Sequence, residues 1–347
     1  MTRVLTVNPG SHSLQLHVVD VGDGDRFTVV DERSRSTRPG TDEARADLQA
    51  ILEHEPEVVA QRLVHGGTQV REPTPVSDEL VEGLQSLVPL APQHLPATLE
   101  IVEVLGELAP QLTQVLCPDT GFHAGLPEHA AAYALPGPWR RRYGLRRFGF
   151  HGLSCSWALR RAAERLGRPA GDLRLVVAHL GGGCSVTAVD RGHSVDTSMG
   201  FTPLEGAAMS TRSGSVDPGL LLWLIEHAGL GAAEVREQLS TASGLLGLSD
   251  GLSNDTRDLV AAAGSGDDTA AFALSVFEHR IRREIGAVAA ALPQLDALVF
   301  TGEIGADQPE VRQAVTDGLA VLGQVEVVVV DPAEHCELAV QAARSAG

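Results

Sequence analysis

Two short segments of alternating apolar and polar residues, about half a chain apart, follow the same plan. The first, RVLTVNPGSHSLQLHVVD (3–20), has an Asn-Pro-Gly-Ser turn between two alternating runs, and the second, LRLVVAHLGGGCSVTAVDRG (173–192), has a glycine-serine turn. Period-2 alternation on both sides of such a turn predicts a β-hairpin. Two similar hairpins predict a duplicated domain, in which each copy opens with a strand–turn–strand that faces a shared cleft.

Helical and extended segments alternate along the rest of the chain. Helical periodicity predicts helices at 77–90, 98–110, 217–230, 268–292 and 337–346, and apolar runs predict strands at 113–122, 296–300 and 325–331. Strands interleaved with helices indicate an α/β fold. The composition turns abruptly basic at RRRYGLRRFGFHG (140–152), so we place a domain boundary between residues 147 and 148.

Composition narrows the class of protein. At 347 residues and 43% hydrophobic, the chain is long enough for two domains with proper cores. Its formal net charge of −18 argues against a nucleic-acid or anionic-membrane surface. No apolar run approaches membrane-spanning length, the first residues lack a signal-peptide stretch, and the four cysteines form no C-x-x-C pair. We therefore expect a soluble, cytoplasmic protein without a zinc site or a disulfide framework.

All 27 basic residues are arginine, and the chain contains no lysine. This absence excludes a Walker P-loop and a Schiff-base lysine. Any phosphate chemistry must therefore depend on arginine, histidine, backbone amides and metal.

Two arginines occupy positions suited to anion binding. Arg62, in QRLVHGG, projects from a predicted strand end, and Arg212 lies among small residues in LEGAAMSTRSGSVDPG. A single arginine is most often one half of a surface ion pair. Two arginines from loops far apart in sequence are able to clamp a planar phosphoryl group, because guanidinium geometry is bidentate and phosphoryl transfer depends on positioning and electrostatics.

Two histidines and one aspartate are further candidates. His94 lies in a proline-framed turn before a helix, and His151 lies at the predicted domain junction beside a basic cluster. A lone histidine is more often structural, and its place at the junction raises His151 above that expectation. Asp119 follows a predicted strand, where it is either a helix N-cap or a residue that orients a substrate or holds a water on a metal.

The segment LVFTGEIGADQ (298–308) has the pattern of a buried strand running into a glycine turn, which is typical of a phosphate-binding loop. Glu303 lies between its two glycines, where an incoming phosphate would meet a negative charge.

Taken in order, these segments resemble the acetate kinase family over nearly the whole chain. The matching motifs are NPGSHSL, QRLVHGG, LVPLAPQHLP, PDTGFH, RRFGFHG, HLGGGCS, VDTSMGFTPLEG, TRSGSVDPG, SGLLGLS and TGEIGAD. The resemblance implies the acetate and sugar kinase, Hsc70 and actin architecture: two duplicated ribonuclease-H-like domains, 1–147 and 148–332, around a central cleft, with helix 333–347 returning to the first. It also implies a homodimer, joined through the second, nucleotide-side domain, that transfers the γ-phosphoryl group of ATP, with Mg²⁺, directly to a short-chain carboxylate.

The resemblance also implies roles for single residues. Arg62 would hold the substrate carboxylate, Asp119 would be the acidic active-site residue, and His151 and Arg212, supported by His94, would stabilise the transferring phosphoryl group. The apolar lining of the substrate pocket would be Val64, Phe150 and Pro203, and the metal would be placed by Asn8 and Glu337. The nucleotide side would comprise His179, Gly181, Gly182, Gly183, Asp255, Thr256, Arg257, Gly302, Glu303, Ile304 and Gly305.

The nucleotide and metal side departs from the family pattern. The family's lysine after the opening turn is Gln15 here, its aromatic or methionine between Asp and Arg is Thr256, and its last loop carries Glu303 and Ala306. Cys336 takes the place of a metal-ligating glutamate, with Glu337 after it and Glu334 two positions before it.

Three hypotheses remain open. The first is an ATP-dependent carboxylate kinase, for acetate or a more polar acid, since Gln93 stands where a leucine is usual and either contacts such an acid or points to solvent. The second is an acyl-phosphate-handling enzyme that uses pyrophosphate, or water as in a phosphatase. The third is a non-catalytic metabolite-binding homologue, which the intact Arg62, Asp119, His151 and Arg212 disfavour.

Overall fold

The computed structural model describes residues 1–10, 13–37 and 39–346 and forms two compact units. Unit 1 comprises Met1–Ala124, Phe150–Trp157 and Ala333–Gly347, and unit 2 comprises Gly125–Gly149 and Ala158–Pro332. This division differs from the predicted boundary between residues 147 and 148. Segment 125–149 belongs to unit 2 because its backbone is hydrogen-bonded to that unit. The Phe148 amide, for example, donates to the carbonyl of Gly200 at 3.0 Å.

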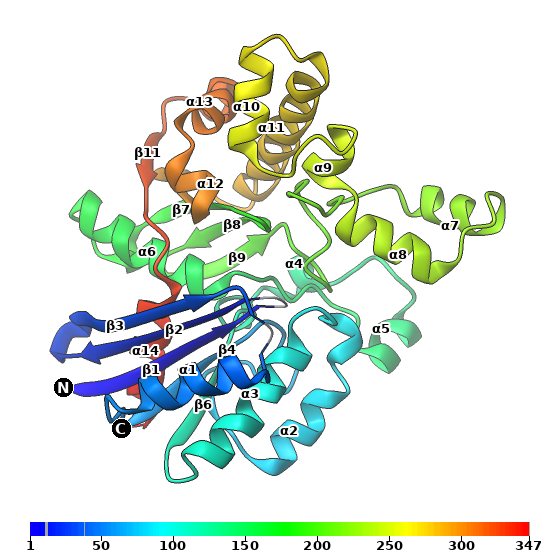
Figure 1. Cartoon of the computed structure of the whole chain (residues 1–347). Coiled ribbons are helices and arrows are strands. Elements are labelled where there is room, and N and C mark those ends of the chain that lie inside the picture. The colour runs from blue at the N-terminus through cyan, green and yellow to red at the C-terminus, as the bar shows by residue number, and fades with distance from the viewer. Residues whose placement is uncertain (11–12, 38, 347) are drawn as a thin grey trace. The chain divides into compact units, whose positions relative to one another are not determined.

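Unit 1 contains a six-stranded sheet in the order β3-β2-β1-β4-β6-β5 (Figure 1). Its strands are β1 (Thr2–Pro9), β2 (Leu14–Val21), β3 (Phe27–Arg35), β4 (Val58–Leu63), β5 (Thr74–Pro75) and β6 (Thr113–Pro118). Its helices are α1 (Asp42–Leu52), α2 (Asp78–Gln85), α3 (Leu95–Leu108), α14 (Glu334–Ala346) and the first turns of α6 (Gly152–Leu166).

Different helices cover the two faces of this sheet, because successive residues of a strand point to opposite faces. Leu5 of β1 packs in one cluster with Leu48 of α1 and Ile101 of α3. Val4, its neighbour in sequence, packs in another cluster with Leu338 of α14. The inner strands β1, β4 and β6 are therefore largely buried, whereas the edge strand β3 is mostly exposed.

Unit 2 contains a five-stranded sheet in the order β11-β10-β7-β8-β9. Its strands are β7 (Arg174–Leu180), β8 (Cys184–Asp190), β9 (His193–Thr197), β10 (Ala297–Thr301) and β11 (Glu326–Val329). Its helices are the rest of α6 with α4 (Glu128–Ala131), α5 (Gly137–Tyr143), α7 (Pro218–Glu226), α8 (Ala232–Thr241), α9 (Gly244–Leu248), α10 (Thr256–Gly264), α11 (Asp268–Ala289), α12 (Gly302–Asp307) and α13 (Pro309–Asp317).

The two sheets share one topology, which confirms the predicted duplication. In unit 1, β1 pairs antiparallel with β2 and parallel with β4, and β4 in turn pairs parallel with β6. In unit 2, β7 pairs antiparallel with β8 and parallel with β10, and β10 in turn pairs parallel with β11. Both predicted hairpins are present, and Ser11 and His12 in the first predicted turn lie outside the described residues.

The predicted glycine turn at residues 302–305 is instead the start of a helix. Strand β10 passes directly into α12, and Gly302 at the junction has a φ of +80°. A Cβ at this position would also collide with the carbonyl oxygen of Leu180 at the end of β7. Glycine is therefore required here by backbone conformation and by close packing. None of the described helices is long and apolar enough to cross a membrane.

Candidate functional site

In unit 1, Arg62 and Asp119 meet at the carboxyl ends of two neighbouring parallel strands. Arg62 is the penultimate residue of β4, and Asp119 follows β6 directly. The Asp119 amide donates to the carbonyl of Leu63 at 2.8 Å, which extends the pairing past the strand ends. The Arg62 guanidinium donates to Asp119 Oδ2 from Nη2 at 2.6 Å and from Nε at 3.0 Å. Because Asp119 is fully buried, this is a charge-assisted pair shielded from water.

Two further side-chain oxygens lie near the same guanidinium. Asn8, near the end of β1, accepts from Arg62 Nη1 at 3.1 Å, and Glu334, at the start of α14, lies 3.8 Å from that nitrogen. Burial lowers the pKa of Arg62, but Asp119 and Glu334 raise it more, so its pKa lies above the ordinary arginine value. Arg62 is thus a permanently charged, oriented cation.

His151 directly precedes α6, close to Asp119. Its backbone has a φ of +57°, a left-handed conformation that is uncommon for a residue other than glycine. The next residue, Gly152, donates its amide to the Asp119 carbonyl at 2.8 Å, and a Cβ there would collide with that oxygen. The close approach of Gly152 to Asp119 therefore places His151, which is buried, near the Arg62 pair.

The other predicted residues of unit 1 lie on neighbouring elements. His94 precedes α3, and Thr98 in the first turn of that helix donates to the Arg62 carbonyl at 3.2 Å. Val64 and Phe150 are buried, whereas Gln93 is exposed.

Two histidines that the sequence analysis did not single out support Phe150. The His65 ring packs edge-on against it with centroids 5.3 Å apart, and His123 Nε2 lies 3.0 Å from its carbonyl oxygen. Burial lowers the pKa of His123 to about 4, so this ring is neutral near pH 7. Their motifs, LVHGG and DTGFH, show the histidines, but nothing in the spacing shows that both contact Phe150.

Glu337, which the sequence predicts to help place the metal, lies in the first turn of α14. Its carboxylate is buried and accepts from Ser156 Oγ at 2.8 Å and from Gln341 Nε2 at 2.9 Å. Cys336 is buried as well. One turn earlier, the Glu334 carboxylate lies on the Arg62 side, so Glu334 is the acid of α14 that faces the candidate site. Within residues 1–10, 13–37 and 39–346, no group of three or more His, Cys, Asp or Glu side chains is arranged to hold a metal by itself.

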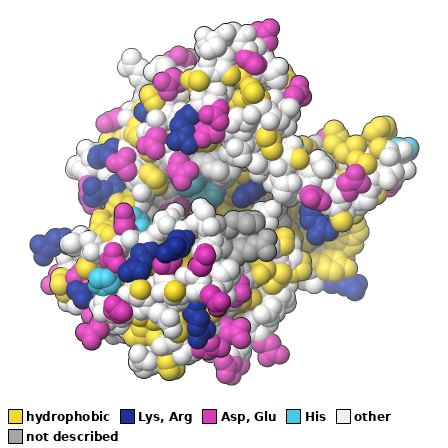
Figure 2. Space-filling view, viewed as in Figure 1, with side chains coloured by type: hydrophobic (Ala, Val, Ile, Leu, Met, Phe, Trp, Pro, Cys, Tyr) yellow, Lys and Arg dark blue, Asp and Glu magenta, His cyan; other side chains and the backbone are white. Residues whose placement is uncertain are grey.

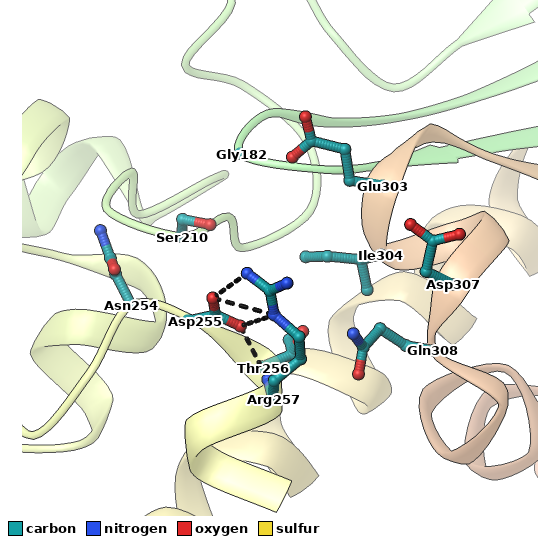
Figure 3. Close-up of a pocket in the computed structure, with 10 residues that line it drawn as sticks. All are labelled: Gly182, Ser210, Asn254, Asp255, Thr256, Arg257, Glu303, Ile304, Asp307 and Gln308. Atoms are coloured by element: carbon teal, nitrogen blue, oxygen red, sulfur yellow. Dashed lines mark hydrogen bonds and ion pairs between the residues drawn. The ribbon is translucent and has the colours of Figure 1, made fainter. Parts of the chain in front are cut away.

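In unit 2, a cavity of about 500 Å³ gathers most of the predicted nucleotide residues (Figure 3). It is lined by Gly182, Ser210, Asn254, Asp255, Thr256, Arg257, Glu303, Ile304, Asp307 and Gln308. Asp255 and Arg257 approach from α10, and Glu303 and Asp307 approach from α12. The lining thus carries three carboxylates and one guanidinium.

Asp255 and Arg257 are hydrogen-bonded to each other. Asp255 caps α10 by accepting from the Arg257 amide at 2.8 Å, and its carboxylate also accepts from Arg257 Nε at 3.0 Å. The hydrogen bond from Arg257 lowers the pKa of Asp255 below its ordinary value. Thr256, between them, is buried and also lines the cavity.

The glycine turn between β7 and β8 lies beside the start of α12. Gly181 donates to the Gly183 carbonyl at 3.0 Å, which closes the turn. Gly182 lines the cavity, and no atom lies within 4 Å of a Cβ built on it. His179, near the end of β7, is buried, and its backbone pairs with Thr301 of β10.

Arg212 is oriented by its own loop. Its Nη1 donates to the Pro203 carbonyl at 3.1 Å and lies 3.8 Å from Met209 Sδ. The backbone around it is pinned, since the Met209 amide donates to the Arg212 carbonyl at 3.0 Å. A Cβ on Gly244 would collide with the Met209 carbonyl, so α9 packs closely against this loop.

The structure adds cavity residues that the sequence analysis did not assign. Ser210 adjoins Arg212, Asn254 precedes Asp255, and Asp307 and Gln308 complete α12 and its C-cap. Ser210, Asp307 and Gln308 lie within the quoted motifs and Asn254 directly precedes a predicted site residue, so proximity in sequence was the available signal. Their orientation depends on helix starts that residue patterns locate only to within a few positions.

Two sheets share the same order in five strands. One ends in a buried arginine–carboxylate pair and the other borders a cavity with a glycine turn, and together they define an α/β kinase of the acetate and sugar kinase, Hsc70 and actin fold. The model of the Acetokinase family matches residues 41–342, and the chain belongs to this family.

Individual relatives agree with this assignment. The chain is 45% identical over 280 residues to the acetate kinase of Deinococcus deserti, covering 80% of this chain and 70% of that one. It superposes on a crystal structure of Porphyromonas gingivalis acetate kinase with a TM-score of 0.90 at 31% identity, covering 100% of both chains. It also matches a propionate kinase from Francisella tularensis with a TM-score of 0.89 at 29% identity, covering 99% of this chain and 100% of that one.

Family membership makes the chain a phosphotransferase with a carboxyl group as acceptor, and it implies ATP as a substrate and a divalent metal ion. Neither the pyrophosphate or phosphatase alternative nor the non-catalytic alternative is favoured by these matches.

Proposed function

We propose that the protein transfers the γ-phosphoryl group of ATP, with Mg²⁺, directly to acetate or a related short-chain carboxylate and releases an acyl phosphate and ADP. The observation that carries this proposal is the Arg62 guanidinium, held by hydrogen bonds to Asp119 and Asn8 at the strand ends of unit 1. A fixed, charged fork of this kind suits a planar carboxylate.

On the acceptor side, Arg62 binds the substrate carboxylate, and Asp119 and Asn8 hold the guanidinium so that little reorganisation is needed. Buried Val64 and Phe150 provide the apolar surface for the short alkyl group. Pro203 is a further proposed lining residue. His94 supports this arrangement through α3, whose Thr98 bonds the Arg62 backbone.

On the donor side, the cavity of unit 2 binds the nucleotide. Its residues are Gly182, Asp255, Thr256, Arg257, Glu303 and Ile304, and His179, Gly181, Gly183, Gly302 and Gly305 shape its border. Gly182, where no atom lies within 4 Å of a Cβ built on it, allows close approach of the phosphates.

The phosphoryl group itself is stabilised by Arg212 and His151. As γ-phosphoryl charge spreads over the equatorial oxygens in the transition state, oriented cationic and N–H donors lower the barrier. Arg212 is pre-oriented by Pro203, and His151 by its strained backbone beside Gly152.

The oxygen donors of unit 1 fit a divalent ion. Mg²⁺ is usually held through one or two carboxylates together with substrate phosphates, and Asn8 and Glu334 offer one amide and one carboxylate oxygen around Arg62. We assign Glu334 rather than Glu337 to this role, because Glu337 is engaged by Ser156 and Gln341. The ion would neutralise phosphate charge when bound.

We further propose that the protein works in the cytoplasm as a homodimer. All four cysteines are free and buried, which suits a reducing compartment. For the dimer contact we propose α7, an apolar helix with no buried residue. Its Leu220, Leu222 and Trp223 are 47%, 57% and 56% exposed, and apolar side chains gather over it in Figure 2. An apolar surface with so few charges is self-complementary and suits a two-fold contact with a second copy.

The direct test is hydroxamate trapping with purified protein, a panel of short carboxylates, and ATP, GTP or pyrophosphate with Mg²⁺. Acyl hydroxamate formed with ATP, and lost in Arg62→Ala, is the expected result. Product with pyrophosphate alone, or hydrolysis of acyl phosphate without synthesis, would contradict the proposal. If Arg62 and Arg212 act in one transfer step, the double variant should lose less than the product of the two single losses.

A further inference from the structure

Three side chains of unit 2 form a connected hydrogen-bond network around residues 198–205. Arg147 Nη2 pairs with Glu205 Oε1 at 2.8 Å, and the Tyr133 hydroxyl donates to Glu205 Oε2. Arg147 also lies over the Tyr133 ring, with Cζ 5.6 Å from the centroid. Each of the three therefore contacts the other two.

The network is attached to the loop backbone at two points. The Phe201 amide donates to the Tyr133 hydroxyl at 2.8 Å, and Arg147 Nη1 donates to the Ser198 carbonyl at 2.9 Å. Tyr133 thus both donates and accepts, which uses both capacities of a phenol. Burial, and then the bond to Glu205, raise the pKa of Tyr133, so the donor proton is retained at neutral pH.

Gly200 has no side chain, and this leaves the space that the network occupies. A Cβ on Gly200 would collide with both Glu205 Oε2 and the Tyr133 hydroxyl oxygen. The Gly200 carbonyl is also fixed, since it accepts from the Phe148 amide at 3.0 Å. The side chains and the loop are therefore fitted to each other.

The loop held in this way carries the acceptor that orients Arg212. Pro203 lies between Phe201 and Glu205, which the network anchors on both sides, and the Pro203 carbonyl accepts from Arg212 Nη1 at 3.1 Å. A shift of the loop would move this oxygen and with it the guanidinium. Phosphoryl-transfer rates are sensitive to such displacements, because about 1 Å of misplacement can cost on the order of 100-fold.

We propose that Tyr133, Arg147 and Glu205 are positioning residues that hold the 198–205 loop so that Pro203 orients Arg212 for phosphoryl transfer. This inference rests on the proposed role of Arg212. None of the three need touch a substrate, so their effect is on the chemical step and not on substrate affinity.

The first test is Tyr133→Phe, which removes only the hydroxyl, with Tyr143→Phe as the matched control because Tyr143 is 57% exposed. We expect kcat to fall about 10-fold or more in Tyr133→Phe, with the KM values for ATP and carboxylate within about two-fold of wild type. Tyr143→Phe should leave all three constants unchanged. Glu205→Gln, which keeps the shape but removes the charge pair with Arg147, should reproduce the Tyr133→Phe pattern. An unchanged kcat in Tyr133→Phe would overturn the inference.

The second test separates positioning of Arg212 from a general structural role. In an Arg212→Ala background, Tyr133→Phe should cause no further loss of kcat, because the group that it positions is already absent. The same fold-loss in both backgrounds would show that Tyr133 does not act through Arg212.

A third readout needs no activity. The Nε–H resonance of ¹⁵N-labelled Arg212 should shift in Tyr133→Phe and stay in place in Tyr143→Phe, and equal spectra would overturn the inference. A wild-type protein that forms no acyl phosphate would refute the proposed function, whereas an active wild type with an unaffected Tyr133→Phe would refute only the positioning network.

Discussion

At the scale of single residues, the site depends on a buried charge pair that residue patterns show only in part. Arg62 and Asp119 are each recognisable in their motifs, as a strand-end arginine and an acid after a strand. Their mutual bond is not predictable, because 57 residues separate them and no local pattern states that β4 and β6 are neighbours. The alternative in which Asp119 is only a helix N-cap does not describe its side chain, which is bound to Arg62.

Asp119→Asn should impair both activity and stability. The change leaves the Arg62 guanidinium largely buried without its main anionic partner, and breaking such pairs destabilises by a few kcal/mol. With Glu334 still 3.8 Å away, we expect a loss of about 2 kcal/mol in the free energy of unfolding and a fall in kcat/KM of about 100-fold or more.

Urea unfolding and steady-state kinetics measure these two effects. Asp172→Asn is the control, since Asp172 is exposed, and it should match the wild type in both. Normal kinetics in Asp119→Asn would show that the acid is not needed to orient Arg62.

At the scale of secondary structure elements, the hairpins and long helices were predictable, because their periodicity is local. The 268–292 prediction corresponds to α11, and the 173–192 hairpin corresponds to β7 and β8. The segment 302–307 was predicted as a loop because its two glycines suggest a turn. It forms α12 because Gly302 supplies the left-handed corner, after which the chain turns into a short helix against the end of β7.

Glu303, which lies on helix α12, can be used to test nucleotide binding. Its carboxylate lines the cavity together with Asp255 and Asp307 and so adds repulsion toward a nucleotide's phosphates. We expect Glu303→Gln to lower the KM for ATP about three- to five-fold, which corresponds to roughly 0.5–1 kcal/mol for a partly solvated charge, with kcat little changed. The effect should shrink at high salt.

Initial-rate kinetics at low and high salt check this expectation. Glu310→Gln, at an exposed position of α13, is the matched control and should leave the KM for ATP unaltered. A raised KM in Glu303→Gln would mean that the glutamate contributes to nucleotide binding.

Two stacked histidines, one of them on helix α14, should make the stability of the protein depend on pH. The His335 ring of α14 stacks on His17 of β2 with centroids 4.1 Å apart, and Glu32 and Glu334 are the acids that face His335. Burial lowers the pKa of His17 to about 4 and also lowers that of His335. Between about pH 6.5, the ordinary histidine value, and pH 4, the unfolded chain therefore binds protons that the folded chain does not. The free energy of unfolding should fall as the pH falls through this window.

His17→Phe keeps an aromatic ring without a titratable nitrogen. In this variant, the slope of the free energy of unfolding against pH should decrease by the contribution of about one proton. Denaturant unfolding at several pH values between 4 and 7 measures the slope, and His193→Phe, at an exposed position of β9, should keep the wild-type slope. An equal slope in His17→Phe would show that this ring does not contribute. The decline should not vanish, because buried His123 also has a lowered pKa.

At the scale of the whole molecule, the duplicated topology gives the chain two related sheets whose strand ends carry different residues. Each sheet has the same order of antiparallel and parallel strands, but the first ends in charged side chains and the second in glycines. The proposed metal acid illustrates the limit of motif matching. Comparison with the family motif pointed to Glu337, the neighbour of Cys336. In the helix, however, Glu337 is hydrogen-bonded to Ser156, and Glu334 lies near Arg62.

Self-association through α7 is testable at this scale. Trp223→Glu should convert a dimer of the 36.5-kDa chain to a monomer, because it places a charge in the proposed apolar contact. Light scattering coupled to size exclusion measures the mass. Trp139→Glu is the control, since Trp139 on α5 is equally exposed at 56%, and it should remain dimeric. Equal masses for the wild type and both variants would place the dimer contact elsewhere.

The central claim is that this chain phosphorylates a carboxylate with ATP. The most direct measurement is ³¹P NMR of purified protein with ATP, Mg²⁺ and acetate, followed over time. An acyl-phosphate resonance should grow in equal amount with ADP, and it should be lost in Arg62→Ala. Release of inorganic phosphate without acyl phosphate, or formation of ADP that is independent of the carboxylate, would contradict it.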